Sequence, residues 1–337
     1  MKRILLLFCA TLFSLSLHCQ VHWTKHEGNP VLERGPAGTW DAKSVGFPCV
    51  ISKDGTYHMW YGGISDTSLN IGYATSDDGI DWTKHEANPV LVTGPPGSWD
   101  DNRVYIPSVI YNEADSIFHM WYVGAGASGY DNNGYASSSD GIHWTKHPNP
   151  TGGGNAMLYQ NNSYHSWSNR SGPDNTMFID YSTSDDCCTW TSVAPSVLSP
   201  ESGKWDYPRV QSSSVLIDGN TYHLWYSGGG FYNWRIGYAT SPDGTNWTKH
   251  LDNPVLDVGS AGSWEETYVA FGSVLFDTVN SLYKMWYYGG KKTFEGNIGY
   301  AEGESTVPDG VSKNNFSDQT RIYPNPADEQ VIIETAQ

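Results

Sequence analysis

IGYATSDDGIDWTKHEANPVLVTGPPGSWDDNRVYIPSVIYNEADSIFHMWYVG, residues Ile71–Gly124, contains three short elements that return along the chain in the same order. Trp-Thr-Lys-His begins at Trp23, Trp82, Trp144 and Trp247, and a degenerate Trp-Thr-Ser begins at Trp190. Tyr/Phe-His/Lys-x-Trp begins at Tyr57, Phe118, Tyr164, Tyr222 and Tyr283. Gly-Tyr-Ala begins at Gly72, Gly134, Gly237 and Gly299, and Asp180-Tyr181-Ser182 takes the remaining position. The tryptophans of the first element are spaced 59, 62, 46 and 57 residues apart, so five copies of one unit indicate a stacked or circular repeat architecture.

Each full copy has the pattern of four short strands. In the first copy we expect strands over 46–52, 56–61, 70–76 and 81–85, with Lys-Asp-Gly and Asp-Asp-Gly turns inside the two hairpins. The first of these strands is apolar throughout, as an innermost strand should be. The 15 Trp, 22 Tyr and 36 Gly favour strands and tight turns over helices, and we expect the repeated aromatic residues to fill the spaces between copies.

The two ends of the repeat array indicate a closed ring. The array begins at His22 with a fourth strand that has no third strand, and it stops at Ala301 with a third strand that has no fourth. Pairing the first strand with the last would complete a fifth unit, whereas a linear solenoid would need capping repeats. We therefore predict an all-β fold, a five-bladed β-propeller over Val21 to about Gly303.

The third copy departs from the others. After His147 it runs PNPTGGGNAMLYQ and omits the Trp-Asp segment, so we expect one shallow side in the ring. Its turn holds Cys187 and Cys188, which could form a vicinal disulfide or remain two thiols. We expect Cys49, which lies among apolar residues, to behave as a small buried hydrophobe.

Charge and repetition exclude several functions. The chain of 337 residues has 36 Asp+Glu against 19 Lys+Arg and no basic stripe, so nucleic acid is not an expected partner. Four recurring strand histidines are interpreted as packed or hydrogen-bonded residues rather than metal ligands, namely His58, His119, His165 and His223. Recurring turn carboxylates are Asp78, Asp140 and Asp243. We expect no cofactor, no metal and a monomer.

Both ends of the chain have the character of export signals. Residues 1–20, MKRILLLFCATLFSLSLHCQ, have a basic start and an apolar run, which predict a secretory signal peptide; a lipoprotein signal ending at Cys19 is the alternative. We expect a polar linker over 304–319. Tyr323-Pro324-Asn325-Pro326 and the alternating run 330–333 resemble the opening of the C-terminal sorting domain of the type IX secretion system of Bacteroidetes-type bacteria. The resemblance implies that residues 320–337 are the start of such a domain, read by secretion machinery that delivers the protein to the cell surface or the medium.

The pattern Gly-Tyr-Ala-x-Ser-x-Asp-Gly-Ile-x-Trp, followed by Asn-Pro-Val-Leu and Trp-Asp, resembles the five-bladed propeller glycosidases of glycoside hydrolase families 43, 32, 68, 117 and 130. The resemblance covers about residues 21–303 and implies cleavage of glycosidic bonds by two carboxyl groups. Family 43-type enzymes place an Asp before a Pro on inner strands. The matching positions here are Phe47-Pro48 and Ile106-Pro107, with Ser212 and Phe271 in later copies, so no acid is carried over.

Candidate site residues are therefore sought at the face where the inner strands begin, because the Trp-Asp segments and several loops meet there. The candidate acids are Asp101, Glu266, Asp41 and Asp206. Asp41 and Asp206 recur with Asp100 and Glu265 directly after a Trp, which also favours a structural role. Candidate substrate-binding residues are Lys43, Arg103, Tyr105, Arg209, Gln211, Tyr232 and Trp234.

Three functions fit this pattern. The first is a secreted glycoside hydrolase that acts on an oligo- or polysaccharide by carboxylate acid/base chemistry. The second is a non-catalytic propeller that binds carbohydrate or protein, which the missing Asp-Pro acids favour. The third is a phosphorylase like those of family 130, in which rim arginines would hold phosphate.

Overall fold

The computed structural model describes residues 20–127, 129–230, 232–292 and 295–306, and within them the regular structure is β-strand apart from one 3-10 turn, η1 (Pro173–Asn175). Strand pairing sorts the twenty strands into five units of four, which we call blades 1–5. Blade 1 is β2 (Ser44–Lys53), β3 (Thr56–Ile64), β4 (Leu69–Ser76) and β5 (Thr83–Lys84); blade 2 is β6 (Arg103–Asn112), β7 (Ile117–Ala125), β8 (Asn132–Ser138) and β9 (Thr145–Lys146). Blade 3 is β10 (Ala156–Gln160), β11 (Ser163–Ser171), β12 (Met177–Ser184) and β13 (Thr191–Leu198); blade 4 is β14 (Arg209–Asp218), β15 (Thr221–Gly229), β16 (Arg235–Ser241) and β17 (Thr248–Lys249). Blade 5 is β18 (Tyr268–Asp277), β19 (Leu282–Lys292), β20 (Glu295–Thr306) and β1 (Gln20–Lys25).

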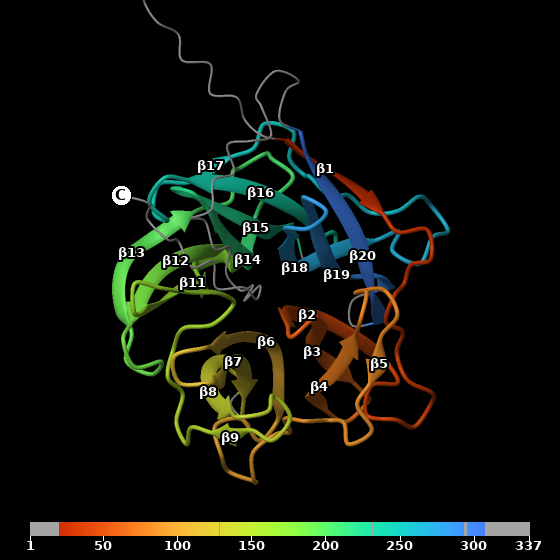
Figure 1. Ribbon diagram of the computed structural model, residues 1–337, viewed down its shortest axis with the longest axis vertical. Helices are drawn as coiled ribbons and strands as arrows, with labels where there is room; N and C mark the ends of the chain where they lie inside the picture. Colours follow the sequence, from red (N-terminus) through yellow and green to blue (C-terminus); the bar gives the residue numbers. More distant parts are fainter. Residues whose placement is uncertain (1–19, 128, 231, 293–294, 307–337) are drawn as a thin grey trace, which may run out of the picture.

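The blades stand around a common centre, with the first strand of each blade innermost (Figure 1). Blades 1, 2 and 5 are separate four-stranded sheets, whereas blades 3 and 4 are joined by one parallel bridge between Met177 and Arg209. The predicted closure is confirmed, because β1 pairs antiparallel with β20 and Trp23 lies opposite Gly303. The propeller fold predicted from the repeats is therefore the observed architecture.

The core consists of aromatic rings at the blade interfaces, as the repeats predicted. One tryptophan in the second strand of every blade is 0% exposed: Trp60, Trp121, Trp167, Trp225 and Trp286. The ring of Trp60 lies 5.7 Å from that of Phe118 in the next blade, and its Nε1 donates to the carbonyl of Gly141 there. Trp121, Trp167 and Trp286 each donate in the same way to a turn carbonyl of the next blade, whereas Trp225 contacts the next blade through the Tyr283 ring, 5.7 Å away, and its Nε1 has no hydrogen-bond partner among the described residues. Burial of these rings holds each blade against its neighbour.

The recurring histidines and turn carboxylates have the structural roles that repetition predicted. Each strand histidine shares a hydrogen bond through Nδ1 with a tyrosine hydroxyl on the adjacent strand, in the pairs His58–Tyr73, His119–Tyr135, His165–Tyr181 and His223–Tyr238. Asp78 accepts hydrogen bonds from the backbone N–H groups of Ile80 and Asp81, and these bonds lower the pKa of its carboxyl. These polar groups therefore hold hairpins together.

Blade 3 is irregular where the sequence predicted it. Its inner strand, β10, has only five residues, and Gly152, Gly153 and Gly154 before it all have positive φ. Cys187 and Cys188 are free thiols, Cys187 buried and Cys188 half-buried. Cys49 is half-buried rather than fully buried, and its sulfur accepts a hydrogen bond from the backbone N–H of Val109.

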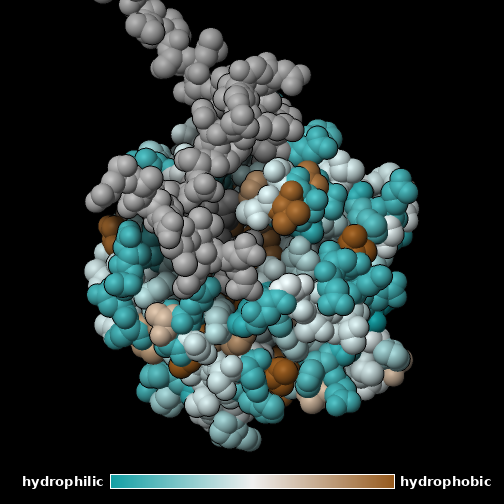
Figure 2. Space-filling model, viewed as in Figure 1, coloured by the Kyte–Doolittle hydropathy of each residue, from teal (hydrophilic) through white to brown (hydrophobic). Residues whose placement is uncertain are grey.

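Hydrophilic residues dominate the part of the surface seen in Figure 2, which suits the formal net charge of −17. Across the described part of the chain, no helix has the length and apolar character needed to cross a membrane. The strands of the propeller extend over 20–306, three residues beyond the expected boundary at Gly303. The predicted signal peptide (except Gln20), the linker beyond Thr306 and the predicted sorting segment lie outside the described residues.

Candidate functional site

Three inner strands carry a strained residue at the same position. The antiparallel register shifts between Gly46 and Cys49 in β2, and the corresponding shift recurs in β6 and β18. Within these bulges Phe47, Ile106 and Phe271 have φ of 54°, 50° and 52°. A left-handed backbone is unusual for bulky or β-branched residues and costs about 1–3 kcal/mol each, and such strain clusters at functional sites.

The bulges bring side chains from four blades into one group at the centre of the ring, which we call the axial aromatic cluster. Its members are Phe47, Tyr105, Ile106, Trp234, Phe271 and Tyr288. The Phe47 ring centroid lies 4.8 Å from that of Phe271, 5.0 Å from Tyr288 and 5.5 Å from Tyr105. Trp234 joins from the loop before β16, with its ring 6.4 Å from Phe271. Phe47 is buried, but the side chains of Tyr105, Ile106, Trp234 and Phe271 are half-exposed.

Blades 3 and 4 contribute amide and hydroxyl groups. The side-chain oxygen of Asn169 accepts a hydrogen bond from the Ser212 backbone N–H at 2.8 Å, and Asn155 accepts one from the Asn169 N–H at 3.2 Å. Asn155 also has a left-handed backbone, with φ of 68°. A narrow axial channel of about 40 Å³ touches all five inner strands, including residues Pro48, Pro107, Asn155, Ser213 and Ser273. Asn155, serine, proline and aliphatic side chains therefore line the channel itself, and the axial aromatic cluster lies at the bulges of three of the same inner strands.

A charged triad borders the axial aromatic cluster in blade 2. The guanidinium of Arg103 donates to the Asp131 carboxylate at 2.9 and 3.1 Å, and the Tyr105 hydroxyl donates to the other carboxylate oxygen at 2.9 Å. Burial and the Asp131 charge both raise the pKa of Tyr105, so its hydroxyl stays protonated. Burial lowers the pKa of Arg103, but hydrogen bonding and charge from Asp131 raise it more.

The acid that follows each Trp in the long connections forms an ion pair with the lysine of the Trp-Thr-Lys-His element. The four pairs are Lys25–Glu265 (2.6 Å), Lys84–Asp41 (2.5 Å), Lys146–Asp100 (2.6 Å) and Lys249–Asp206 (2.5 Å). Both carboxylate oxygens of Asp41 and of Asp206 accept hydrogen bonds inside their own blade. Blade 3 has Ser192 in place of the lysine and no Trp-Asp segment, so both partners are missing together. Asp41 and Asp206 therefore have a structural role, because their ion pairs fix the long connections to the outer strands of their blades.

The other two candidate acids close turns in the same connections. Asp101 accepts a hydrogen bond from the Gly97 N–H at 2.6 Å, and Glu266 accepts one from the Gly262 N–H at 2.5 Å. The ammonium of Lys291 lies 3.8 Å from Glu266. Asp101 and Glu266 therefore occupy equivalent half-exposed positions in blades 2 and 5.

The structure brings some candidate substrate-binding residues together and leaves others apart. Arg103, Tyr105 and Trp234 lie in or beside the axial aromatic cluster. Arg209 donates to the Asn175 carbonyl and Gln211 to the Met177 sulfur, so both are engaged with blade 3. Lys43 lies 3.6 Å from Asp66 at the rim of blade 1, and Tyr232 is 69% exposed.

Sequence reasoning missed Asp131, Asn155 and Asn169 as site residues. Asp131 lies in the loop between β7 and β8, and nothing in the repeats indicates its contact with Arg103 on β6. Phe47, Ile106 and Phe271 had a signal, because they occupy the positions where the resembled enzymes carry acids. Among the described residues, no cluster of three His, Cys, Asp or Glu side chains is arranged to hold a metal ion.

Comparisons with known proteins support the fold. No family model matches the chain. An uncharacterised protein of Mycobacterium tuberculosis is 31% identical over 115 residues, so the chain spans about a third (34%) of that curated relative and the match covers 31% of this chain. A glycosyl hydrolase from Bacteroides ovatus has a TM-score of 0.69 at 16% identity, with 86% of this chain and 95% of that chain covered. A β-1,2-mannobiose phosphorylase from Listeria innocua has a TM-score of 0.65 at 14% identity, with 83% of this chain and 96% of that chain covered. At these identities the likeness is one of fold.

Proposed function

We propose that the protein binds carbohydrate at the axial aromatic cluster. The observation that carries the proposal is a cluster of aromatic rings from blades 1, 2, 4 and 5, in which Tyr105, Trp234 and Phe271 are half-exposed, together with amide and hydroxyl groups at the inner strands of blades 3 and 4. A sugar ring has an apolar C–H face and hydroxyl groups at its edge. Aromatic faces bury the first, and amides and a charged triad can exchange hydrogen bonds with the second.

Binding without hydrolysis is the form that the geometry favours. A glycosidase needs one protonated carboxyl group and one carboxylate flanking the scissile bond, with the two groups within about 10 Å. The inner-strand bulges present Phe47, Ile106 and Phe271 to the axis instead of acids. Asp41, Asp206, Asp101 and Glu266 each accept hydrogen bonds from their own connections. Asp131 is a further carboxylate beside the axial aromatic cluster, and it is engaged by Arg103 and Tyr105.

Hydrolysis is the second candidate, and the solved structures with this fold favour it. The names of the glycosyl hydrolase from Bacteroides ovatus and the mannobiose phosphorylase from Listeria innocua describe proteins that act on glycosidic bonds. For this chain, the catalytic pair would come from Asp101 and Glu266, with Arg103 and Arg209 orienting the substrate or, in phosphorolysis, phosphate.

One experiment separates these functions. A glycan array would identify a ligand, and isothermal titration would give its affinity for the wild type and for Trp234→Ala, which removes an exposed ring of the axial aromatic cluster. We expect at least about tenfold weaker binding for the variant, the loss of one stacking contact. The same glycan is then incubated with the wild-type protein, with and without phosphate, and its cleavage is measured. Turnover that is abolished by Asp101→Asn or Glu266→Gln would establish catalysis and contradict a binding-only role.

We also infer that the protein is exported to the cell surface or the medium. The support is the sequence of residues 1–20 and of residues 321–327. Fractionation of cells that express the full chain tests this. Retention of the protein in the cytoplasm with residues 1–20 still attached would contradict it.

A further inference from the structure

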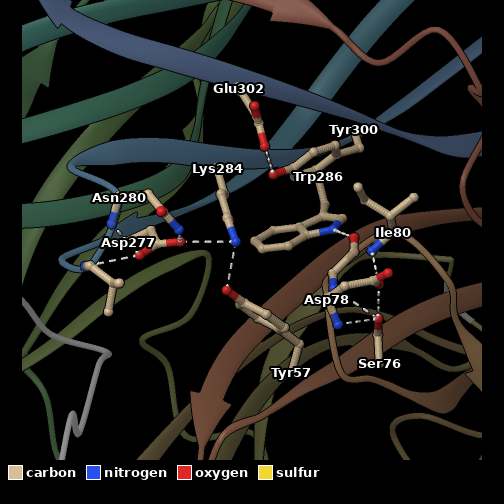
Figure 3. Close-up of polar contacts among 12 residues, drawn as sticks. Tyr57, Ser76, Asp78, Ile80, Asp277, Asn280, Lys284, Trp286, Tyr300 and Glu302 are labelled. Carbon is tan, nitrogen blue, oxygen red and sulfur yellow. Dashed lines mark hydrogen bonds and ion pairs between the residues drawn. The ribbon is translucent and has the colours of Figure 1, made fainter.

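The shortening of blade 3 lies at the face that carries the axial aromatic cluster. The opposite end of the blade keeps the regular contact: the Trp121 indole donates to the Cys187 carbonyl at 3.0 Å, as the Trp286 indole donates to the Gly79 carbonyl at 2.6 Å (Figure 3). The spacing of 46 residues that ends at Trp190, against 57–62 elsewhere, therefore reflects residues that are missing from the other face.

At that face the inner strand of blade 3 stops short and leaves part of β11 uncovered. In blade 1 the inner ladder continues to Ser44 opposite Ile64, and Tyr61–Ile64 is buried, as the matching residues are in blades 2, 4 and 5. In blade 3 the ladder begins at Ala156 opposite Trp167, and within the described ranges no inner strand continues along Ser168–Ser171. These four residues are half-buried or exposed, and we call them the open edge of β11.

Polar side chains replace an aromatic pair at the open edge of β11. In blade 1 the Trp40 ring lies 5.8 Å from that of Tyr61, and a Cβ at Gly63 or Gly72 would collide with the Trp40 indole. The two glycines recur in the other regular blades as Gly124 and Gly134, Gly228 and Gly237, and Gly289 and Gly299. Blade 3 has no Trp-Asp segment, and Ser168, Arg170 and Asp180 take the positions of Tyr61, Gly63 and Gly72.

Arg170 is held in place by its neighbours and still faces solvent. Its Nε donates to Asp180 at 2.7 Å and its Nη2 to the Ser196 hydroxyl at 2.6 Å, and the guanidinium carbon lies 5.1 Å from the centre of the Phe178 ring. The Ser196 N–H donates to the other oxygen of Asp180 at 2.7 Å. Nη1 has no partner among the described residues, and the Arg170 side chain is 43% exposed. The pair therefore presents a fixed donor beside a fixed acceptor.

The open edge of β11 adjoins the axial aromatic cluster. The Asn169 side-chain oxygen accepts from the Ser212 N–H at 2.8 Å, and Ser212 takes in β14 the bulge position that Phe47 takes in β2. In blade 3 the alignment puts Gly154 at that position. Bulky side chains thus stand at the bulge position in blades 1, 2 and 5, and small ones in blades 3 and 4. A ligand longer than one sugar has its clearest way out over blade 3.

We propose that the open edge of β11 is an outer carbohydrate subsite. A glycan chain with one sugar at the axial aromatic cluster extends over blade 3, where Arg170 and Asp180 exchange hydrogen bonds with hydroxyl groups of the following sugars. This inference rests on the carbohydrate binding proposed above and adds that the ligand is a chain of several neutral sugars. An acidic chain is disfavoured, because Asp180 balances the charge of Arg170 and the whole protein has a formal net charge of −17.

The test measures affinity against chain length by isothermal titration. The probes are neutral gluco-, manno-, xylo- and galacto-oligosaccharides of two, four and six residues, with oligogalacturonates of the same lengths as the acidic comparison. Arg170→Ala removes the outer donor, and Ser168→Tyr restores the tyrosine that the other blades carry. Arg34→Ala makes the matched change at an exposed arginine beside blade 1. Thermal unfolding checks that each variant is folded.

We expect the wild type to bind the tetrasaccharide of one neutral series at least about tenfold more tightly than the disaccharide. Arg170→Ala and Ser168→Tyr should each weaken tetrasaccharide binding at least about fivefold and leave disaccharide binding within about twofold. Arg34→Ala should change neither. The outer subsite would be overturned by equal wild-type affinity at all lengths, by equal losses at both lengths in Arg170→Ala, by a loss in Arg34→Ala, or by tighter binding of the oligogalacturonates.

Trp234→Ala distinguishes failure of the outer subsite from failure of the axial site. This variant should weaken binding of both lengths. If it does so and Arg170→Ala has no effect, the outer subsite alone is wrong. If Trp234→Ala has no effect, or if no series binds, the proposed function is wrong and the outer subsite falls with it.

Discussion

The Lys249 ammonium lies 2.5 Å from a carboxylate oxygen of Asp206, and the two side chains are 17% and 2% exposed. The lysine also donates to the Ser199 carbonyl at 2.7 Å, so it ties the outer strand of blade 4 to the long connection that precedes the blade. Because this pairing recurs in four blades and both partners are missing in blade 3, it is a structural unit of the repeat.

Breaking this pair should destabilise the propeller. Asp206→Asn leaves the Lys249 charge without its counter-ion, and we expect the free energy of unfolding to fall by about 2–3 kcal/mol, less than for a fully buried pair because the lysine is partly exposed. Denaturant unfolding measures the change. Asp66→Asn, in which a 93% exposed side chain is altered, is the control and should change stability by less than about 0.5 kcal/mol. Equal effects of the two substitutions would contradict a structural role for the pair.

The left-handed bulge residues should be replaceable without loss of stability. Ile106→Asn places a residue that tolerates φ of 50° at a half-exposed position, so relief of backbone strain should offset the lost apolar contact to within about 1 kcal/mol. Val104, two residues earlier on β6 and 0% exposed, is the control: Val104→Asn buries an amide and should cost more than about 3 kcal/mol. Thermal unfolding and glycan titration are measured on both.

Ile106→Asn should nevertheless weaken glycan binding, because it removes an apolar side chain from the axial aromatic cluster. A destabilisation as large as that of Val104→Asn would show instead that Ile106 is ordinary core.

Stability should fall as the pH drops from about 6.5 to about 4. Burial lowers the pKa of His223 from 6.5 to about 4, and it lowers the pKa of His58, His119 and His165 in the same direction. Above pH 6.5 these histidines are neutral in both states. Below it the unfolded chain takes up protons that the folded chain cannot, so the free energy of unfolding declines until the folded histidines also become protonated.

Thermal midpoints measured across this range check the effect. His223→Gln should flatten the slope between pH 6.5 and 4 relative to the wild type. A midpoint independent of pH in this window would mean that the folded histidines titrate normally.

The repeats predicted most of the fold because the same residues recur in every blade, and recurrence marks structural positions. The closure followed from Trp23 and Tyr300, the two incomplete ends of the array. The site was harder to predict. The ion pair of Asp41 with Lys84 joins residues 43 positions apart and depends on the fold of the long connection that carries Asp41. The joint loss of both partners in blade 3 was nevertheless visible in the sequence.

The axial aromatic cluster was predicted only in part: Tyr105 and Trp234 were candidate binding residues, but their packing against Phe47 and Phe271 depends on the bulges. A bulge changes the face toward which the following side chains point, and the alternating pattern of β2, β6 and β18 does not reveal it. Phe47 and Phe271 occupy matched positions of the repeat, but their contacts with each other and with Tyr105 follow from the bulges.

Isothermal titration of the best glycan-array ligand against the wild type and Phe271→Ala tests the central claim most directly. Phe271 contacts both Phe47 and Trp234 and is half-exposed at the axis. The account predicts at least about tenfold weaker binding for Phe271→Ala with an unchanged fold by circular dichroism. Unchanged affinity in the folded variant would place the ligand elsewhere and contradict the axial site.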